Sequence, residues 1–276
     1  MSKVWMITGA GRGLGRAFAL EAAANGDQVI AAVRKLGADD ELTQSENVLP
    51  VFMDVTKPDE IAAAVKAGME KIGRIDVLVN NAGFGMSGAF EETSDAELRH
   101  LFETDYFGVV NVTKAVLPIM RAQKNGMILN VSSQAGAMGF LGSSAYCSAK
   151  FAVVGLSAAL SMELTAFGIQ VASILPGSFR TDFRDDSSMC HPQNEMSEYE
   201  NTAVRATKEF LATHNHMQEG DPAKAAKFLY GIVSSGKLPK RILIGGKCCE
   251  DLKADLEAQI AEIDGYIAEA SETDFE

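Results

Sequence analysis

Tyr146 and Lys150, a phenol and an ammonium four positions apart, are the side chains in this sequence best suited to acid–base chemistry. On a helix this spacing places both on one face. The ammonium favours the phenolate, so the pair predicts a Tyr146 pKa lowered toward the working pH, as a general acid or base requires. Ser133 ends an apolar strand pattern thirteen positions earlier, where its hydroxyl is placed to hold a substrate oxygen. Together these residues predict proton transfer at an oxygen atom.

A glycine-rich segment, residues 8–15, predicts a site for the phosphates of a nucleotide. It follows one apolar strand pattern directly and opens a helical one. Glycines permit a tight turn and a close approach of the backbone to a pyrophosphate, which the positive end of the helix attracts. The strand–turn–helix context makes the motif much more specific than glycines alone. The residues expected at the cofactor here are Gly9, Gly11, Arg12, Gly13, Leu14 and Gly15.

The end of the second strand pattern indicates which dinucleotide binds. In the usual dinucleotide fold, an acidic residue about 20 positions beyond the glycines binds the ribose hydroxyls. Here the strand pattern ends at Val33, Arg34 and Lys35, without an acid. A carboxylate would repel a 2′-phosphate, whereas a guanidinium binds it through paired hydrogen bonds. Arg34, together with Arg12 in the turn, therefore predicts NADP(H) rather than NAD(H).

The elements that must position these residues alternate short apolar strand patterns with longer helical ones. The strand patterns cover 3–8, 28–33, 48–53, 77–80, 127–132, 170–175 and 241–244, and the helical patterns cover 14–24, 58–71, 95–121, 148–166 and 222–234. Uninterrupted apolar strands separated by helices indicate a parallel sheet buried on both faces. With right-handed crossovers the prediction is an α/β fold, a Rossmann-type doubly wound parallel sheet. No Pro/Ser-rich linker or repeat interrupts it, so we expect a single domain over 1–276.

Two segments break the alternation. Residues 178–220 follow the sixth strand pattern without a clear strand of their own and mix aromatic residues and methionines with charges. Because ligands bind at that end of a doubly wound sheet, we interpret this segment as a substrate lid; the alternative is a variable surface insertion. Residues 250–276 carry apolar side chains at helical spacing between acidic ones, which predicts an amphipathic helix covering its own domain or a second subunit. The apolar positions are Leu252, Leu256, Ile260, Ile263 and Ile267.

Composition limits the possible partners and compartments. The formal net charge of −12 argues against binding to nucleic acids or anionic membranes, which need a basic surface. The uncharged segment 125–149 is too rich in Asn, Ser and Gly for a membrane span. An apolar strand pattern begins at Val4, which argues against a signal peptide. Four cysteines without CxxC spacing fit a reducing compartment, so we expect a cytoplasmic protein.

Two histidines, His214 and His216, are the nearest the sequence comes to a metal-binding pattern. No Cys or His stands at a recognised ligand spacing from them. We interpret both as solvated loop residues and expect no metal site.

Six motifs in order along residues 3–181 resemble those of the classical short-chain dehydrogenase/reductase family. They are the TGAGRGLG turn at 8–15, Asp54 after the third strand pattern, NNAG at 80–83, Ser133, YCSAK at 146–150, and Pro176-Gly177 after the sixth strand pattern. Each motif alone can arise by chance, whereas six in this order on the expected elements make the resemblance specific.

The resemblance implies a role for each matching residue. Tyr146 protonates a carbonyl oxygen or deprotonates an alcohol, Lys150 lowers its pKa and binds the nicotinamide ribose, and Ser133 orients the substrate oxygen. Hydride passes directly between the substrate carbon and the nicotinamide. The further cofactor contacts it implies are Asp54 and Val55 at the adenine, Asn81, Ala82 and Gly83 along the cleft, and Pro176, Gly177 and Thr181 toward the carboxamide.

One position departs from the family pattern. By its spacing to Gly108, Asp105 stands where the family usually has an asparagine that helps an ordered water link the catalytic lysine to solvent. An ionised aspartate accepts hydrogen bonds without donating them, and it can pair with Lys150 and favour the charged lysine. We hypothesise a working but altered proton relay that includes Asp105. A different register would leave Asp105 outside the relay, with Asn111 in another role on the same helix.

These observations predict an NADP(H)-dependent oxidoreductase that interconverts a carbonyl and a secondary alcohol. The apolar loop 140–142 and the lid favour a small to medium, largely apolar substrate. The resemblance implies a homodimer or homotetramer formed through the fourth and fifth helices. Two alternatives use the same residues: an epimerase or dehydratase, whose relatives are usually longer, and a non-catalytic NADP(H)-binding redox sensor. Such sensors typically lack the tyrosine or the lysine, both of which are present here.

Overall fold

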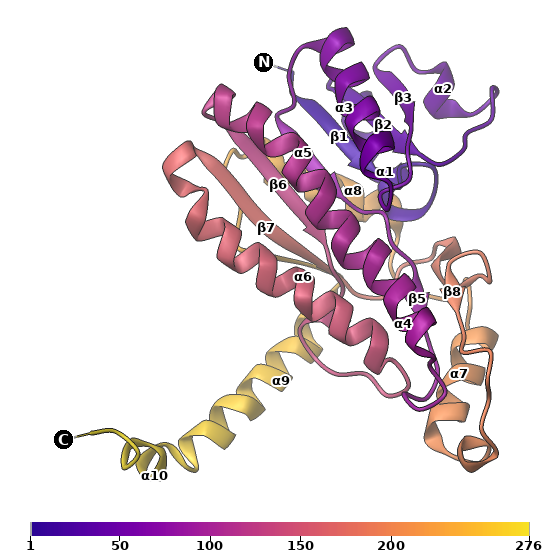
Figure 1. Cartoon of the computed structure of the whole chain (residues 1–276), viewed down its shortest axis with the longest axis vertical. Coiled ribbons are helices and arrows are strands. Elements are labelled where there is room, and N and C mark those ends of the chain that lie inside the picture. Colours follow the sequence, from indigo (N-terminus) through magenta and orange to yellow (C-terminus); the bar gives the residue numbers. More distant parts are fainter. Residues whose placement is uncertain (1, 276) are drawn as a thin grey trace.

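Seven strands pair in parallel to form the central sheet of the computed structural model, which describes residues 2–275 (Figure 1). Their order across the sheet is β3-β2-β1-β4-β6-β7-β9. The strands are β1 (Val4–Thr8), β2 (Gln28–Val33), β3 (Val48–Phe52), β4 (Val77–Asn80), β6 (Gly126–Val131), β7 (Ile169–Pro176) and β9 (Arg241–Ile244). The direction of winding reverses between β1 and β4, which makes this the switch point where such sheets bind ligands. The predicted doubly wound parallel sheet is confirmed.

Helices cover both faces of the sheet and bury two apolar layers. On one face lie α1 (Gly13–Ala24) and α8 (Pro222–Ser234), whose residues pack with one side of the strands. On the other lie α3 (Pro58–Ile72), α5 (Gly108–Gln123) and α6 (Ser144–Glu163). Because both faces are covered, β1 and β4 are buried along their whole length and are apolar up to Thr8 and Asn80 at their ends.

The fourth helical pattern, predicted over 95–121, is interrupted. It begins with α4 (Asp95–Phe102), passes through the single π-helical turn Glu103–Phe107, and continues as α5. π-helical turns insert one extra residue into a helix and occur frequently at functional sites. This one carries Asp105, which is completely buried.

The helix predicted over 148–166 begins earlier than expected. α6 starts at Ser144, so Tyr146 lies in its first turn rather than in the loop before it. Its length and composition would suffice to cross a membrane. α6 instead packs along β7, and one face of it, which includes Ala149, Lys150 and Val153, is buried inside the protein.

The segment 178–220 leaves the sheet after β7 and returns almost to its starting point, where Phe179 and Gly220 form an isolated parallel bridge. Contrary to the expectation that it lacks strands, it contains β8 (Met189–Cys190), which pairs with β5 (Gly85–Met86). It also contains α7 (Ala203–Thr213). Two-residue strands are too short to leave an alternating pattern in the sequence. The small α2 (Glu41–Gln44) was not predicted either.

The C-terminal stripe lies on α9 (Gly246–Asp264) and α10 (Ile267–Ser271), which extend away from the sheet (Figure 1). Only Leu252 is buried; Leu256, Ile260, Ile263 and Ile267 are each at least 40% exposed. The amphipathic helix is therefore present, but most of its stripe does not cover its own domain.

Candidate active site

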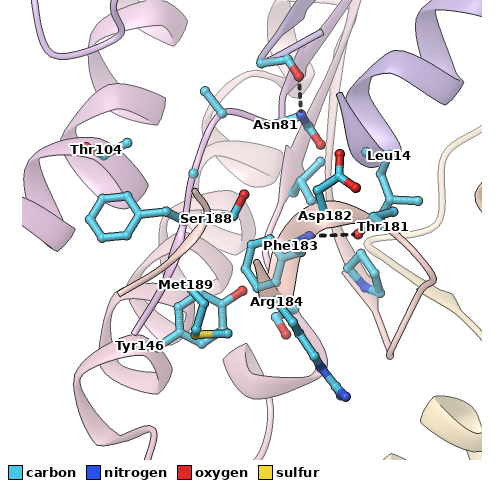
Figure 2. A pocket seen from close by; sticks show the side chains of 18 of the residues that line it. Leu14, Asn81, Thr104, Tyr146, Thr181, Asp182, Phe183, Arg184, Ser188 and Met189 are labelled. Carbon is cyan, nitrogen blue, oxygen red and sulfur yellow. Dashed lines mark hydrogen bonds between the residues drawn. The ribbon is translucent and has the colours of Figure 1, made fainter. Parts of the chain in front are cut away.

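A cavity of about 960 Å³ opens at the carboxyl ends of the strands, beside the switch point. It runs from the glycine turn past Ser133 and Tyr146 to the segment 178–220 (Figure 2). Most of the residues predicted to bind a cofactor line it. They are Gly9, Gly11, Arg12, Gly13, Leu14, Arg34, Asp54, Val55, Asn81, Ala82, Gly83, Tyr146, Lys150, Pro176, Gly177 and Thr181.

The glycine turn has the geometry that a pyrophosphate requires. Gly9 and Gly13 have φ values of +64° and +57°, which side chains rarely tolerate. A Cβ at Gly9 would also lie 2.9 Å from the Ala82 Cα. α1 begins at Gly13, and its N-cap residue, Arg12, makes no side-chain capping bond. The amide groups at this helix end thus face the cavity without a capping side chain, as a phosphate site needs.

Gly15 belongs to the turn but does not line the cavity. A Cβ there would lie 2.3 Å from Asn81 Nδ2 and 2.6 Å from the Gly9 carbonyl oxygen. Its role is therefore to let α1 approach the turn closely, and not the predicted contact with the cofactor.

Thr8, which sequence analysis did not single out, fixes the loop after β4 to the glycine turn. Its hydroxyl accepts hydrogen bonds from the amides of Asn81 and Ala82, at 2.9 and 3.0 Å. The Asn81 side chain donates in return to the carbonyl oxygens of Thr8 and Gly9. The position of Thr8 at the carboxyl end of the first strand pattern was the available signal.

The two arginines predicted to hold a 2′-phosphate differ in their surroundings. Arg34 is exposed at the end of β2. Burial acts to raise the pKa of Asp54, but hydrogen bonds from Thr56 and the charge of Arg34 help to outweigh it, so the pKa is lowered. Asp54 accepts hydrogen bonds from the Thr56 amide and hydroxyl. Arg12 instead donates to the Ser187 hydroxyl and carbonyl oxygen, at 2.7 and 2.9 Å. Both guanidinium groups line the cavity, and Arg12, unlike Arg34, is hydrogen-bonded to the segment 178–220.

The Tyr146–Lys150 pair lies in the cavity as the sequence predicts. Lys150 Nζ is 5.6 Å from the centre of the Tyr146 ring. It donates to the Val131 carbonyl oxygen at 3.3 Å and forms an ion pair with Asp105 Oδ2 at 3.0 Å. Burial lowers the pKa of Lys150, but Asp105 and Tyr146 outweigh it, so the pKa stands above its usual value and the ammonium is retained. The predicted contact between Asp105 and Lys150 is thus present.

The prediction of a lowered Tyr146 pKa is wrong for this structure. Burial raises it most strongly; Lys150 and the Ser133 hydroxyl lower it, while the charge of Asp105 raises it further. The sequence showed the lysine but could not show how strongly the site removes water from the phenol. The phenol therefore keeps its proton at neutral pH, and the raised pKa makes it a weaker acid than an ordinary tyrosine.

Asp105 is a buried carboxyl with few partners. Its Oδ1 accepts one hydrogen bond from the Phe84 amide at 3.0 Å, and Oδ2 has no directed hydrogen bond besides its ion pair with Lys150. Burial raises the pKa of Asp105, against the opposing effect of Lys150. A Cβ at Gly83 would lie 3.0 Å from Oδ2, so the carboxyl also packs against the cofactor loop.

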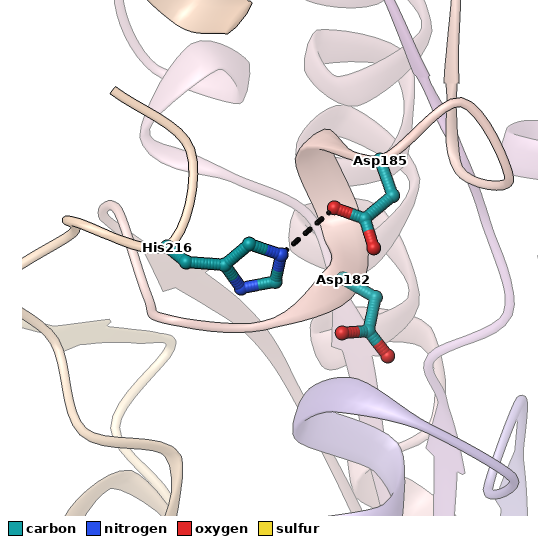
Figure 3. A group of neighbouring side chains, drawn as sticks. All are labelled: Asp182, Asp185 and His216. Atoms are coloured by element: carbon teal, nitrogen blue, oxygen red, sulfur yellow. Dashed lines mark hydrogen bonds and ion pairs between the residues drawn. The ribbon is translucent and has the colours of Figure 1, made fainter. Parts of the chain in front are cut away.

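The two histidines, His214 and His216, contact different neighbours. The His214 ring stacks on Phe210 with centroids 4.1 Å apart, whereas His216 Nε2 lies 3.0 Å from Asp185 Oδ1. Asp182 completes a group of three polar side chains at the edge of the lid (Figure 3). His216 and Asp182 are exposed and Asp185 is half-exposed; His216 contacts Asp185, and the three side chains lie close enough together to ligate a metal ion.

Together, the doubly wound sheet, the phosphate-binding turn and the Tyr–Lys pair define a dinucleotide-dependent oxidoreductase. A family model described as short chain dehydrogenase matches residues 3–190. Oxidoreductase BOA17 of Botryotinia fuckeliana is 42% identical over 270 residues, which cover 93% of this chain and 96% of that protein. The chain belongs to the short-chain dehydrogenase/reductase family.

Solved structures agree in fold and differ in the cofactor they contain. A short-chain dehydrogenase from Streptomyces avermitilis is 38% identical, with a TM-score of 0.91 over 100% of both chains. A family member from Burkholderia phymatum in complex with NAD is 25% identical, with a TM-score of 0.79 over 94% of this chain and 95% of its own. ElxO with NADP bound is 27% identical, with a TM-score of 0.71 over 88% of this chain and 96% of its own.

Proposed function

We propose that this protein is an NADP(H)-dependent reductase of ketones or aldehydes, with Tyr146 as the proton donor. The observation that carries the proposal is the position of Tyr146 and Lys150 on one face of α6, in the same cavity as the glycine turn. The glycine turn would hold the pyrophosphate of a dinucleotide, and Tyr146 lines the same cavity. The intact pair also favours catalysis over the non-catalytic sensor.

A bound nicotinamide supplies or accepts the hydride. As hydride adds to the carbonyl carbon, the π electrons move to the oxygen, and the Tyr146 hydroxyl transfers its proton to that oxygen. The Ser133 hydroxyl is positioned to hold the same oxygen. Lys150 stabilises the phenolate that remains, and Asp105 holds the ammonium in place. Alcohol oxidation follows the reverse path, with the phenolate as base.

The preference for NADP(H) rests on Arg34. It stands at the end of β2, where an acid would bind the ribose of NAD(H), and its guanidinium lines the cavity. Arg12 would have to leave Ser187 to bind the same phosphate. Arg34 is therefore the principal 2′-phosphate ligand in this proposal.

The proposal is tested by the loss of reduced-nicotinamide absorbance with a panel of ketones, aldehydes and quinones, using NADPH and NADH in parallel. We expect turnover with NADPH, and a fall in kcat of about 10²- to 10⁴-fold in Tyr146→Phe, the range for removal of a general acid. The variant should still bind the cofactor in a fluorescence titration, because its glycine turn is intact. Turnover with NADH alone would contradict the role of Arg34, and full activity of Tyr146→Phe would contradict the mechanism.

A further inference from the structure

Arg184 is a half-buried cation in the wall of the cavity without an acidic partner. It is the last residue of the short 3₁₀ turn Asp182–Arg184, which Thr181 caps at its start. Its Nη2 donates to the Ser178 hydroxyl at 3.1 Å, a neutral group on the same segment. Among the residues that the structure describes, no carboxylate lies within ion-pair distance of Arg184.

The nearby acids do not form ion pairs with Arg184 in the part of the chain that the structure describes. Asp185 accepts hydrogen bonds from Asn215 and His216, and Asp182 leaves the turn on the opposite side, toward Leu14 (Figure 2). Burial lowers the pKa of Arg184, with no carboxylate to offset it. A desolvated guanidinium is costly unless an anion completes its hydrogen bonds. The unliganded protein thus holds a cation at a position that an anion would stabilise.

Arg184 stands at the substrate end of the cavity. Its neighbour in sequence, Phe183, lies with its ring centre 6.0 Å from that of Tyr146. Figure 2 shows Arg184 leaving the turn on the side opposite Asp182 and Leu14, with its guanidinium directed away from Tyr146 and Met189. The other walls of this end are mainly apolar: Met86, Phe140, Leu141, Phe183, Met189 and Leu211.

We infer that the carbonyl substrate carries an anionic oxygen group that pairs with Arg184, joined to its carbonyl by an apolar body. The inference rests on the proposed function and specifies its substrate class. The planar guanidinium matches a carboxylate or phosphate with two parallel hydrogen bonds, while the apolar walls take the chain between the charge and the carbonyl. Arg184 thereby fixes which end of the substrate faces Tyr146, and it is a specificity residue.

The test compares charged and neutral forms of one ketone. Levulinate and a longer methyl-ketone acid are assayed with their methyl esters, and dihydroxyacetone phosphate serves as the phosphate arm. For the wild type we expect kcat/KM to favour an acid over its ester by about tenfold or more, the range for a charge-assisted hydrogen bond. Arg184→Met should lower kcat/KM for the acid by about 10- to 100-fold and leave the ester nearly unchanged. Preference for the phosphate over both acids would assign the site to phosphate esters.

Arg180→Met is the matched control, because Arg180 lies on the same segment but is exposed outside the cavity. It should leave the acid-to-ester ratio unchanged. Calorimetric titration of the cofactor-saturated enzyme with the same compounds measures binding without turnover, so it tests Arg184 even if the proposed reaction is wrong. Equal binding of acid and ester, or weaker cofactor binding in Arg184→Met at an unchanged acid-to-ester ratio, would overturn the inference. The latter outcome would assign Arg184 to a cofactor phosphate.

Discussion

Two buried carboxylates in this protein, Asp105 and Glu92, each pair with a cation, and yet their pKa values are shifted in opposite directions. Asp105 lies in the π-helical turn behind the active site and meets Lys150. Glu92 precedes α4 and meets Arg205 of α7 at 2.6 Å. Both carboxylate side chains are 0% exposed.

The two differ in their hydrogen bonds. Glu92 accepts from the Ala89 amide, the Met196 amide and the Arg205 guanidinium. Burial raises the pKa of Glu92, but these donors together outweigh burial and keep it below the usual value. Asp105 accepts from a single amide besides its ion pair, and there burial prevails and raises the pKa. Asp105 lies deeper in the protein and accepts fewer hydrogen bonds than Glu92, and both differences favour the neutral acid at Asp105.

The opposite pKa shifts indicate a structural role for Glu92 and a role beside the catalytic residues for Asp105. Glu92 is held ionised and joins segments more than 100 positions apart, since Met196 and Arg205 both belong to 178–220. It thus fixes that segment over the cavity, where Thr207 and Leu211 of α7 form part of the wall. Asp105 has a raised pKa and pairs with a lysine that adjoins Tyr146. An incompletely satisfied buried acid is suited to a proton relay.

Replacing Lys150 with Met should have the largest effect on activity. Without the ammonium, only the Ser133 hydroxyl offsets the burial that raises the Tyr146 pKa, and the phenolate formed in the reaction loses its nearest positive charge. We expect kcat/KM for ketone reduction to fall by about 10²- to 10⁴-fold. The free energy of urea-induced unfolding should fall by less than about 3 kcal/mol, the lower end for a broken buried pair, because Asp105 can take up a proton.

Arg205→Met provides the contrast, because it removes the cation from the carboxylate that is held ionised. It should reduce stability more than Lys150→Met while affecting kcat far less. If both variants lose equal stability, the distinction between the two carboxylates fails.

Glu92→Gln should loosen the segment 178–220 without stopping the chemistry. An amide cannot accept from three donors as a carboxylate does, so we expect KM to rise by about tenfold with kcat changed by less than about threefold, an effect of 1–2 kcal/mol on binding. Hydrogen exchange should quicken in residues 189–213 and remain unchanged in β1 and β4. Faster exchange across the whole sheet would show a general loss of stability instead.

The same variant has a defined pH dependence. Because the folded pKa of Glu92 is below its ordinary value of 4.5, its stabilising effect is present above that pH and is lost as the pH falls through the folded pKa. The wild type should therefore lose stability more steeply than Glu92→Gln below about pH 4.5.

The contrast between these sites also shows what the sequence could reveal. Local patterns were sufficient for the parallel sheet, because apolar strands between helices leave few alternatives, and for Tyr146 and Lys150, because four positions on one helix fix their relation. Arg184 and Glu92 carry no such pattern. Their roles depend on contacts between distant segments, and these contacts follow from the course of 178–220, whose two-residue strand has no sequence signature.

The Tyr146 pKa shows a different limit. The sequence identified the neighbouring charge correctly, but the direction of the shift depends on how completely the cavity removes water from the phenol. Desolvation is a property of the whole packed site. The same reason explains why Asp105 could be placed beside Lys150 by spacing while its raised pKa could not be anticipated.

Asp105→Asn tests whether Asp105 belongs to the proton relay, and we expect it to change activity less than the preceding variants. The carboxylate raises the pKa of Tyr146, so removing its charge should lower that pKa. Alcohol oxidation needs the phenolate, and its rate should therefore rise at lower pH than in the wild type, by about one unit or less, or at most about 1.4 kcal/mol. The pH profile of kcat/KM for oxidation measures this shift, with Glu92→Gln as the matched buried-acid control whose profile should not move. An unchanged profile in Asp105→Asn would remove Asp105 from the relay and leave it a structural partner of Lys150, with the same standing as Glu92.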